Sequence, residues 1–278
     1  MAAALSSNTT LETLEMGSNG ISSQGVGCLG AALMQNKTLR VLEISFNGMG
    51  DEGAILLSNA LPLNTGLQHL GLGFNGIMPE GVKAIAKTLP TNKTLVSLEL
   101  SYNLVEDRGA SELAIAVGSG CSLQNLGLSS NGITDEGAES LAVALESPNC
   151  TLETLSLASN AITDRGAMRL AQALYINTCL KALYLEENDF GTAGMDALRE
   201  AQKMTVSLTE MSSERKFAVA MCQHRRLGAS SGLSSLSDDL LRTVIRMCQA
   251  VEVRHVVSYP KDQTIPGAPH PVVPDLSA

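Results

Sequence analysis

The sequence predicts a curved α/β solenoid in which short parallel strands alternate with helices. Each predicted strand is closed by an asparagine, and these asparagines recur at intervals of 28 or 29 residues: Asn19, Asn47, Asn75, Asn103, Asn131, Asn160 and Asn188. The segment before each one fits L-x-x-L-x-L-x-x-N, with Met16 and Ile44 as apolar replacements at the third leucine. Apolar residues at helical spacing then follow. Such a period indicates stacked units that bury their apolar faces against one another.

The strand of each repeat is predicted from an alternation of period two. Leu42 and Ile44 alternate with Glu43 and Ser45, as expected of a strand that buries one face. Asn47 then ends the segment. Its amide has two N–H donors and one carbonyl acceptor, so we expect it to bind loop backbone groups of its own and the next repeat.

The helix of each repeat is predicted from an acidic start and an apolar stripe. Residues such as Ala54, Leu57 and Leu61 recur at helical spacing. An acidic residue precedes each stripe, and we expect it to cap the helix that it opens: Asp51, Glu80, Asp107, Asp135 and Asp164. Parallel strands need a crossover, and helices are wider than strands. Stacking therefore curves the array, with strands on the concave side and helices on the convex side.

The 28-residue period and the G-A-x-x-L-A-x-A-L helix pattern resemble the ribonuclease-inhibitor-like class of leucine-rich repeats. This class also occurs in the repeat regions of nucleotide-binding immune receptors and Ran GTPase-activating proteins. The resemblance covers residues 1 to about 200. It implies a leucine-rich repeat solenoid. It leaves the function open, because members of the class bind many unrelated partners.

The repeat array is predicted to span residues 1–211. At its end Gln202 replaces the helix-closing leucine, and the next strand is reduced to Leu208 and Met211. At its start, Ala4 and Leu5 occupy the places of a helix end. The first unit is therefore half a helix, and we expect either missing sequence before it or a partner that covers this end.

Two further segments follow the array. Residues 212–252 contain two amphipathic patterns, and we expect them to form a C-terminal helical cap. Residues 253–278 hold most of the prolines and are predicted to be a flexible tail. The stretch 236–246 also weakly resembles the opening helix of F-box-like modules and part of a SOCS box. That resemblance implies an alternative role as a substrate adaptor for a ubiquitin ligase.

Charge favours a protein partner over nucleic acid. The net charge of −9 is concentrated in residues 1–205, which hold 21 acidic and 11 basic side chains. An acidic surface repels phosphates and favours a basic protein surface. No apolar run is long enough to span a membrane, and the six cysteines form no metal-binding pattern. We therefore expect free thiols, no metal or cofactor, no membrane association, and a cytoplasmic location with the nucleus as an alternative.

The candidate partner-binding residues come from two columns of the repeat that flank the buried leucines. The column before the asparagines contains three consecutive aromatics, Phe46, Phe74 and Tyr102. A second column contributes Glu15, Glu43, Glu99 and Tyr184. Aromatic anchors beside acidic residues are typical of a binding site for a basic protein segment. Stacking of the aromatics between repeats is the alternative explanation.

The leading functional prediction is a non-catalytic interaction module or scaffold that binds protein on its acidic concave face. Alternatives are a regulator of a small GTPase, as the resemblance to the Ran regulators implies, and the repeat fragment of an immune-type sensor. An enzyme is disfavoured because the four histidines are scattered and no nucleophile accompanies them. No phosphate-binding glycine pattern follows a strand.

Overall fold

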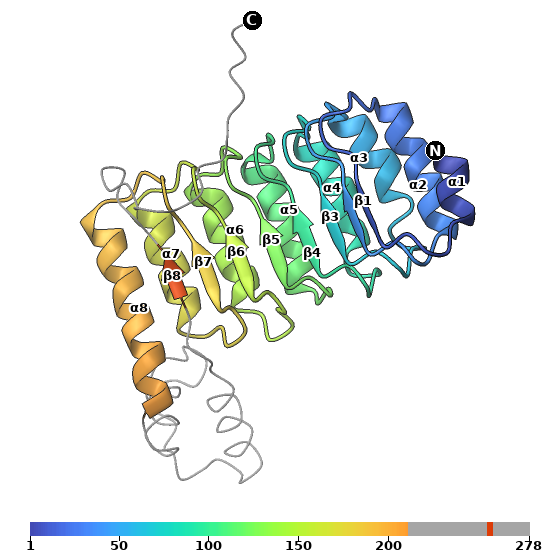
Figure 1. The fold of residues 1–278 in the computed structure, drawn as a ribbon. Helices are drawn as coiled ribbons and strands as arrows, with labels where there is room; N and C mark the ends of the chain where they lie inside the picture. The colour runs from blue at the N-terminus through green and yellow to red at the C-terminus, as the bar shows by residue number, and fades with distance from the viewer. Residues whose placement is uncertain (211–254, 258–278) are drawn as a thin grey trace, which may run out of the picture.

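The computed structural model describes the backbone of residues 1–210 and 255–257 and the burial of side chains in residues 1–202. Helices and strands alternate along this part of the chain (Figure 1). The helices are α1 (Ala2–Ser7), α2 (Ser23–Gln35), α3 (Gly50–Ser58), α4 (Pro79–Thr88), α5 (Glu106–Gly118), α6 (Asp135–Leu145), α7 (Asp164–Leu174) and α8 (Thr192–Glu210). The strands are β1 (Thr13–Glu15), β2 (Val41–Glu43), β3 (His69–Gly71), β4 (Ser97–Glu99), β5 (Asn125–Gly127), β6 (Thr154–Ser156), β7 (Ala182–Tyr184) and β8 (His255–Val257).

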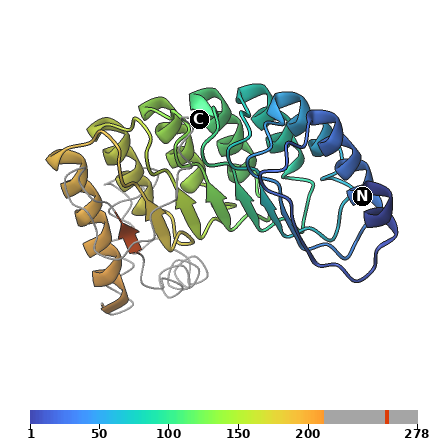
Figure 2. The same ribbon diagram turned by 45° about the horizontal axis from the view of Figure 1, so that its top comes forward.

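The strands form one parallel sheet in the order β1 to β8. Equivalent residues of successive repeats pair directly, so that Leu14 faces Leu42 and Leu42 faces Leu70. Figure 2 shows the sheet along the inner side of the arc and the helices along its outer side. The predicted α/β solenoid, with concave strands and convex helices, is therefore confirmed.

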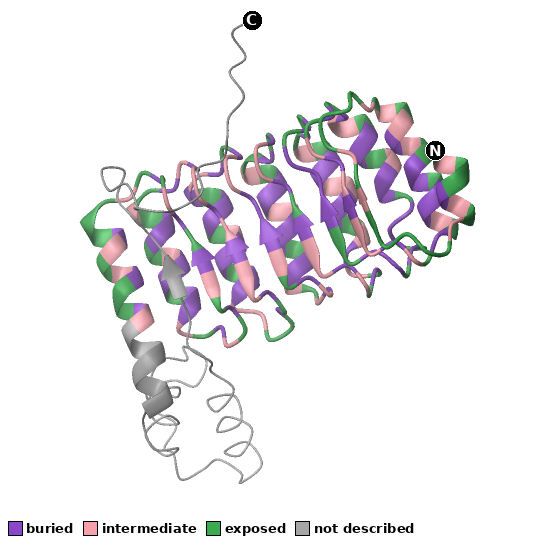
Figure 3. Cartoon of the chain, in the orientation of Figure 1, coloured by how far each residue is buried: buried purple, intermediate pink, exposed green. Residues whose placement is uncertain are grey.

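The core lies between the sheet and the helices. The middle leucine of each inner strand is buried, as are the apolar residues that each helix turns inward, such as Ala54 and Leu57 of α3. Leu61, expected in the same helical stripe, is buried too but lies beyond the end of α3 at Ser58. Figure 3 shows buried residues on the facing sides of both layers. Small side chains such as Ala54 and Ala138 are fully buried too, which lets adjacent helices pack closely.

The asparagines that close the strands join each repeat to the one before it. The Asn47 Oδ1 atom accepts hydrogen bonds from the backbone N–H groups of Asn19 and Ile21, at 3.0 and 2.9 Å. Its Nδ2 atom donates to the Met16 carbonyl at 3.0 Å and to Ile44 of its own repeat at 2.9 Å. The predicted role is confirmed, but the predicted direction was wrong, because the bonds run to the preceding repeat. Only Asn19, which has a single neighbouring repeat, is exposed.

A second set of buried asparagines lies before the strands. Asn64 donates from Nδ2 to the carbonyls of Leu33 and Asn36, at 2.7 and 2.9 Å. Its Oδ1 atom accepts from Gly66 and Leu67 at 3.0 and 2.7 Å. The members are Asn36, Asn64, Asn92 and Asn177. Sequence analysis missed this set, although the first three recur at a spacing of 28 residues.

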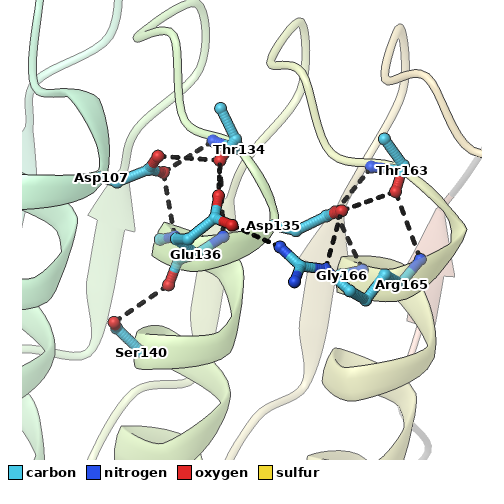
Figure 4. Close-up of polar contacts among 9 residues, drawn as sticks. Asp107, Thr134, Asp135, Glu136, Ser140, Thr163, Arg165 and Gly166 are labelled. Atoms are coloured by element: carbon cyan, nitrogen blue, oxygen red, sulfur yellow. Dashed lines mark hydrogen bonds and ion pairs between the residues drawn. The ribbon is translucent and has the colours of Figure 1, made fainter.

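The four aspartates among the predicted caps bind the helix start of the next repeat, which corrects the prediction that they cap their own. The fifth predicted cap, Glu80, pairs with Arg108 instead. The Asp107 Oδ1 atom accepts from the backbone N–H groups of Thr134 and Gly137, at 2.8 and 2.9 Å. Asp135 binds Thr163 and Gly166 in the same way, at 2.8 and 2.9 Å (Figure 4). The first turn of the recipient helix supplies otherwise unpaired N–H groups and a positive dipole end.

A glycine in the recipient helix makes this capping possible. A Cβ atom on Gly137 would lie 2.6 Å from the Asp107 Oδ1 atom, and one on Gly81 would lie 2.5 Å from that of Asp51. Contacts this short do not occur for real Cβ atoms. The recurring acidic and glycine positions of the sequence are therefore partners across neighbouring repeats.

The C-terminal end of the array differs from the prediction in two places. Helix α8 continues to Glu210, so Leu208 lies in a helix and the reduced strand expected there is absent. Residues 255–257, expected in a flexible tail, form β8, which pairs in parallel with β7. The predicted helical cap at 212–252 and most of the tail lie outside the described residues.

Candidate functional site

The three aromatic side chains lie just beyond the carboxyl ends of their strands. Phe46, Phe74 and Tyr102 each follow the last strand residue by three positions. Their φ angles are 58°, 53° and 59°, a left-handed conformation that L-residues adopt at a cost of about 1–2 kcal/mol. The other repeats share this conformation at the same position. The turn therefore aims one side chain per repeat in the same direction.

The aromatic rings stack on one another along this turn. The Phe46 and Phe74 ring centroids are 4.0 Å apart at an interplanar angle of 13°. The Phe74 and Tyr102 centroids are 4.1 Å apart at 15°. Phe46 nevertheless remains 41% exposed and Phe74 36% exposed. Stacking, the alternative explanation for the column, is thus present, and it leaves a continuous apolar surface open to solvent.

The glutamates of the second column lie along the sheet beside this stack. A Cβ atom on Gly71 would meet the Glu43 carboxylate at 1.7 Å, and one on Gly127 would meet that of Glu99 at 1.9 Å. Each carboxylate therefore lies over the glycine of the next strand. The Glu99 Oε1 atom also accepts from the Ser101 backbone N–H at 2.7 Å, which fixes the side chain in place.

In the described part of the chain these carboxylates lack an ionic partner, and two of them belong to residues that pair directly across strands. Glu15 and Glu43 are paired in register on adjacent strands, which lie about 4.8 Å apart in a sheet. Within the described residues, neither they nor Glu99 form an ion pair, whereas Glu136 and Glu146 pair with arginines on the helices. Like charges on neighbouring strands are destabilising, and a bound cation relieves the repulsion.

The whole edge of the solenoid that carries the stack is acidic. We define the carboxyl-end rim as the seven segments from the last strand residue to the first helical turn: 15–25, 43–53, 71–81, 99–109, 127–137, 156–166 and 184–194. It holds 14 of the 21 acidic and two of the 11 basic side chains of residues 1–205. Both basic residues, Arg108 and Arg165, already pair with acidic neighbours. The rim is thus predominantly acidic.

Not all predicted residues come together. Tyr184 ends β7, three strands beyond Glu99, and is 37% exposed. It therefore belongs to the same face but not to the aromatic stack. Sequence analysis missed two apolar residues on the rim, Met78 at 48% and Leu104 at 51% exposure. The exposure of Leu104 could have been predicted from its position after the repeat asparagine, where four other repeats have glycine.

The described residues contain no group of three or more His, Cys, Asp or Glu side chains placed to hold a metal ion. Within the same ranges, no helix is long and apolar enough to cross a membrane. Cys121 and Cys150 are buried, and burial raises the pKa of both thiols. A raised pKa keeps these two thiols protonated and poorly nucleophilic.

Comparisons with known proteins agree with the repeat geometry. A family model described as "Leucine Rich repeat" matches seven segments that together make up more than half of the chain: 7–30, 35–58, 63–86, 91–114, 121–142, 149–171 and 177–198. These matches, with the stacked strands and helices, define a leucine-rich repeat solenoid. The chain belongs to the leucine-rich repeat family.

Similarity to individual proteins is weak. The tropomodulin C-terminal domain of Caenorhabditis elegans is 17% identical at a TM-score of 0.46, covering 52% of this chain and 89% of that domain. The leiomodin-1 actin-binding site 2 structure is 15% identical at a TM-score of 0.35, covering 78% of this chain and 95% of that one. No curated protein matches the sequence.

Proposed function

We propose that this chain is a non-catalytic protein-interaction module that binds a basic segment of another protein. The segment lies along the concave strands and the adjacent carboxyl-end rim. The observation that carries the proposal is the stack of Phe46, Phe74 and Tyr102, which stays exposed at its edges after the rings have packed together. Exposed aromatic clusters bordered by charge are typical of binding hot spots.

The negative charges beside the stack favour a partner segment of positive charge. Glu43 and Glu99 are held in place by hydrogen bonds from Ser45 and Ser101, at 3.0 and 2.7 Å from the backbone nitrogens. Their positions are thus fixed before a ligand arrives, which reduces the entropy lost on binding. Because they have no cationic partner within the described residues, lysine or arginine of a bound segment supplies one.

A labelled decapeptide of alternating lysine and glycine tests the sign of the partner. Fluorescence anisotropy at physiological ionic strength gives its dissociation constant for the wild-type chain, Glu99→Gln and Glu139→Gln. Glu139 is an exposed residue of α6 on the convex side and is the matched control. We expect Glu99→Gln to weaken binding at least threefold and Glu139→Gln to leave it within error. Equal effects of the two substitutions would contradict the proposal.

Two further parts of the proposal rest on the sequence. A cytosolic or nuclear location is supported by the cysteine pattern, and fractionation of cells expressing the tagged chain tests it. A partner that covers the N-terminal edge is supported by Leu11, which is 39% exposed beside β1. Light scattering coupled to size exclusion tests this part, because a clean, soluble monomer argues against a covering partner.

A further inference from the structure

We infer that the free face of the Tyr102 ring is a seat for an arginine of the partner, whose guanidinium continues the aromatic stack over Ser130. The inference rests on the proposed function, since it names the side chain of the basic segment that binds there. The sequence places Ser130 in the column of the aromatics, but it does not show which face of each ring is covered.

The stack has two open ends. Phe74 covers one face of Tyr102, with centroids 4.1 Å apart. The next repeat presents Ser130 at the equivalent position, in the same left-handed conformation, with φ of 53° against 59° at Tyr102. Ser130 is directed like the rings, but a hydroxymethyl group is too small to cover one. No ring of the column therefore covers the second face of Tyr102, whose side chain is half-buried. Ser18 leaves a similar place beside Phe46 at the other end.

The Glu99 carboxylate, held in place by the Ser101 N–H, lies in the repeat at the Tyr102 end. Glu15, in the repeat that carries Ser18, makes no such hydrogen bond within the described residues. The Glu99 side chain lies over Gly127, which belongs to the same repeat as Ser130. The Glu43 carboxylate lies over Gly71, in the repeat that carries the central ring of the stack. Of these two fixed carboxylates, only that of Glu99 therefore reaches a repeat at an end of the stack. A cation seated over Ser130 has an aromatic face on one side and a negative charge nearby.

Arginine fits this place better than lysine or another aromatic. Its guanidinium is planar, stacks on aromatic faces, and binds carboxylates with two parallel hydrogen bonds. A lysine ammonium is a strongly hydrated point charge that gains less from a flat ring face. An aromatic side chain could stack but would leave Glu99 unpaired. The rim, with 14 acidic and two basic side chains, adds a general attraction for a cationic segment.

Three labelled decapeptides test the inference by fluorescence anisotropy. One alternates arginine with glycine, one alternates lysine with glycine, and one is the lysine peptide with a central phenylalanine. We expect the arginine peptide to bind wild type about fivefold more tightly than the lysine peptide, the size expected of an exposed cation–π contact. Tyr102→Ala should reduce this ratio to about one.

Filling the seat is the more specific test, because it adds a ring without removing one. Ser130→Phe places an aromatic at a position whose backbone already carries phenylalanine in repeats two and three. This variant should also lower the arginine-to-lysine ratio to about one. Ser18→Phe, the same change at the other end of the stack, should leave the ratio near five. Circular dichroism melting curves check that all variants are folded.

The outcomes separate this inference from the proposed function. If arginine and lysine peptides bind equally and Glu99→Gln weakens both, the proposed function stands and the arginine seat is wrong. A ratio that survives Ser130→Phe, or tightest binding by the phenylalanine peptide, also overturns the seat. If no peptide binds the folded chain, both proposals fail.

Discussion

The Asp135 carboxylate accepts a hydrogen bond from the backbone nitrogen of Gly166, 31 residues later and in the next repeat, at 2.9 Å. Thr163 donates to the same carboxylate from its backbone nitrogen at 2.8 Å and from its hydroxyl at 2.6 Å. Together with the strand-closing asparagines, which bind the preceding repeat, this arrangement links the repeats that carry the aspartate in both directions. These polar links hold the turns that present the aromatic stack.

The glycine that receives the aspartate should be sensitive to a single added carbon. In Gly166→Ala the new Cβ would lie 2.6 Å from the Asp135 Oδ1 atom and 2.7 Å from the Ile162 Cγ2 atom. We expect a loss of about 1–3 kcal/mol in the free energy of unfolding, measured by urea denaturation. Gly118→Ala is the control, because its Cβ has ordinary contacts at 3.6 Å or more. Equal stability of both variants would contradict the account.

The capping carboxylate should make stability depend on acid. Burial is the largest influence on Asp135 and raises its pKa, but the combined hydrogen bonds from Thr163, Gly166 and Arg165 hold the pKa below its usual value. The ionised form therefore stabilises the fold fully above the unfolded pKa of about 3.9. This contribution is lost as the pH falls through the lower folded pKa.

Asp135→Asn isolates this contribution. The variant should be less stable than wild type by about 1–2 kcal/mol at neutral pH. The difference should narrow as the pH drops below about 4, since the wild-type carboxyl then becomes neutral too. Urea denaturation at a series of pH values measures it. A difference that stays constant through this range would show that the charge of Asp135 does not matter.

Helix α5 begins under strain because its aspartate is missing. Pro79 stands where four other repeats have the capping aspartate, and Glu106 adopts a φ of 51° while its N–H donates to the Asn131 carbonyl at 3.0 Å. Gly50 has the same conformation at the start of α3, and the repeat before α3 has Ser23 in place of the aspartate. The conformation at the start of a helix therefore depends on whether the preceding repeat supplies an aspartate.

Replacing Glu106 with glycine should relieve this strain. We expect Glu106→Gly to raise the free energy of unfolding by about 0.5–1 kcal/mol, because the left-handed penalty exceeds the entropy cost of glycine. Glu139→Gly makes the same exchange in the interior of α6 and should lower stability by about 1 kcal/mol. Thermal and urea unfolding measure both. Destabilisation by Glu106→Gly would argue against a strained start.

The described cysteines should divide into two classes of reactivity. Cys28 and Cys179 are exposed, whereas Cys121 and Cys150 are buried with raised pKa values. Brief alkylation of the folded chain, mapped by peptide mass spectrometry, should modify the exposed pair and spare the buried pair. All four should react in denaturant. Rapid labelling of Cys121 in the folded chain would show that the loops before β5 open readily.

The fold was predictable because a period of 28 residues, repeated seven times, leaves few alternatives. The directions of the polar links were not predictable in the same way. The sequence shows that Asn47 and Asp51 recur, but not that Asn47 binds the preceding repeat and Asp51 the following one. Those directions depend on how far successive repeats are offset, which a periodic pattern does not record.

The site was predictable as a pair of columns but not as a geometry. A shared repeat position placed Phe46, Phe74 and Tyr102 in one line, and their stacking follows from the common left-handed turn. The sequence shows that Glu43 and Glu99 alternate with glycines on neighbouring strands. Only the side-chain positions show that each carboxylate lies over the glycine of the next strand. Strand β8 was hidden because its partner β7 lies about 70 residues earlier in the chain.

The most direct test of the account is the affinity of the lysine–glycine decapeptide for Phe74→Ala, measured by fluorescence anisotropy. Ile115→Ala is the matched control, because Ile115 is a 64% exposed apolar residue on convex helix α5. We predict that Phe74→Ala weakens binding at least fivefold while Ile115→Ala changes it less than twofold. A folded Phe74→Ala chain that binds the peptide as tightly as wild type would contradict the central claim.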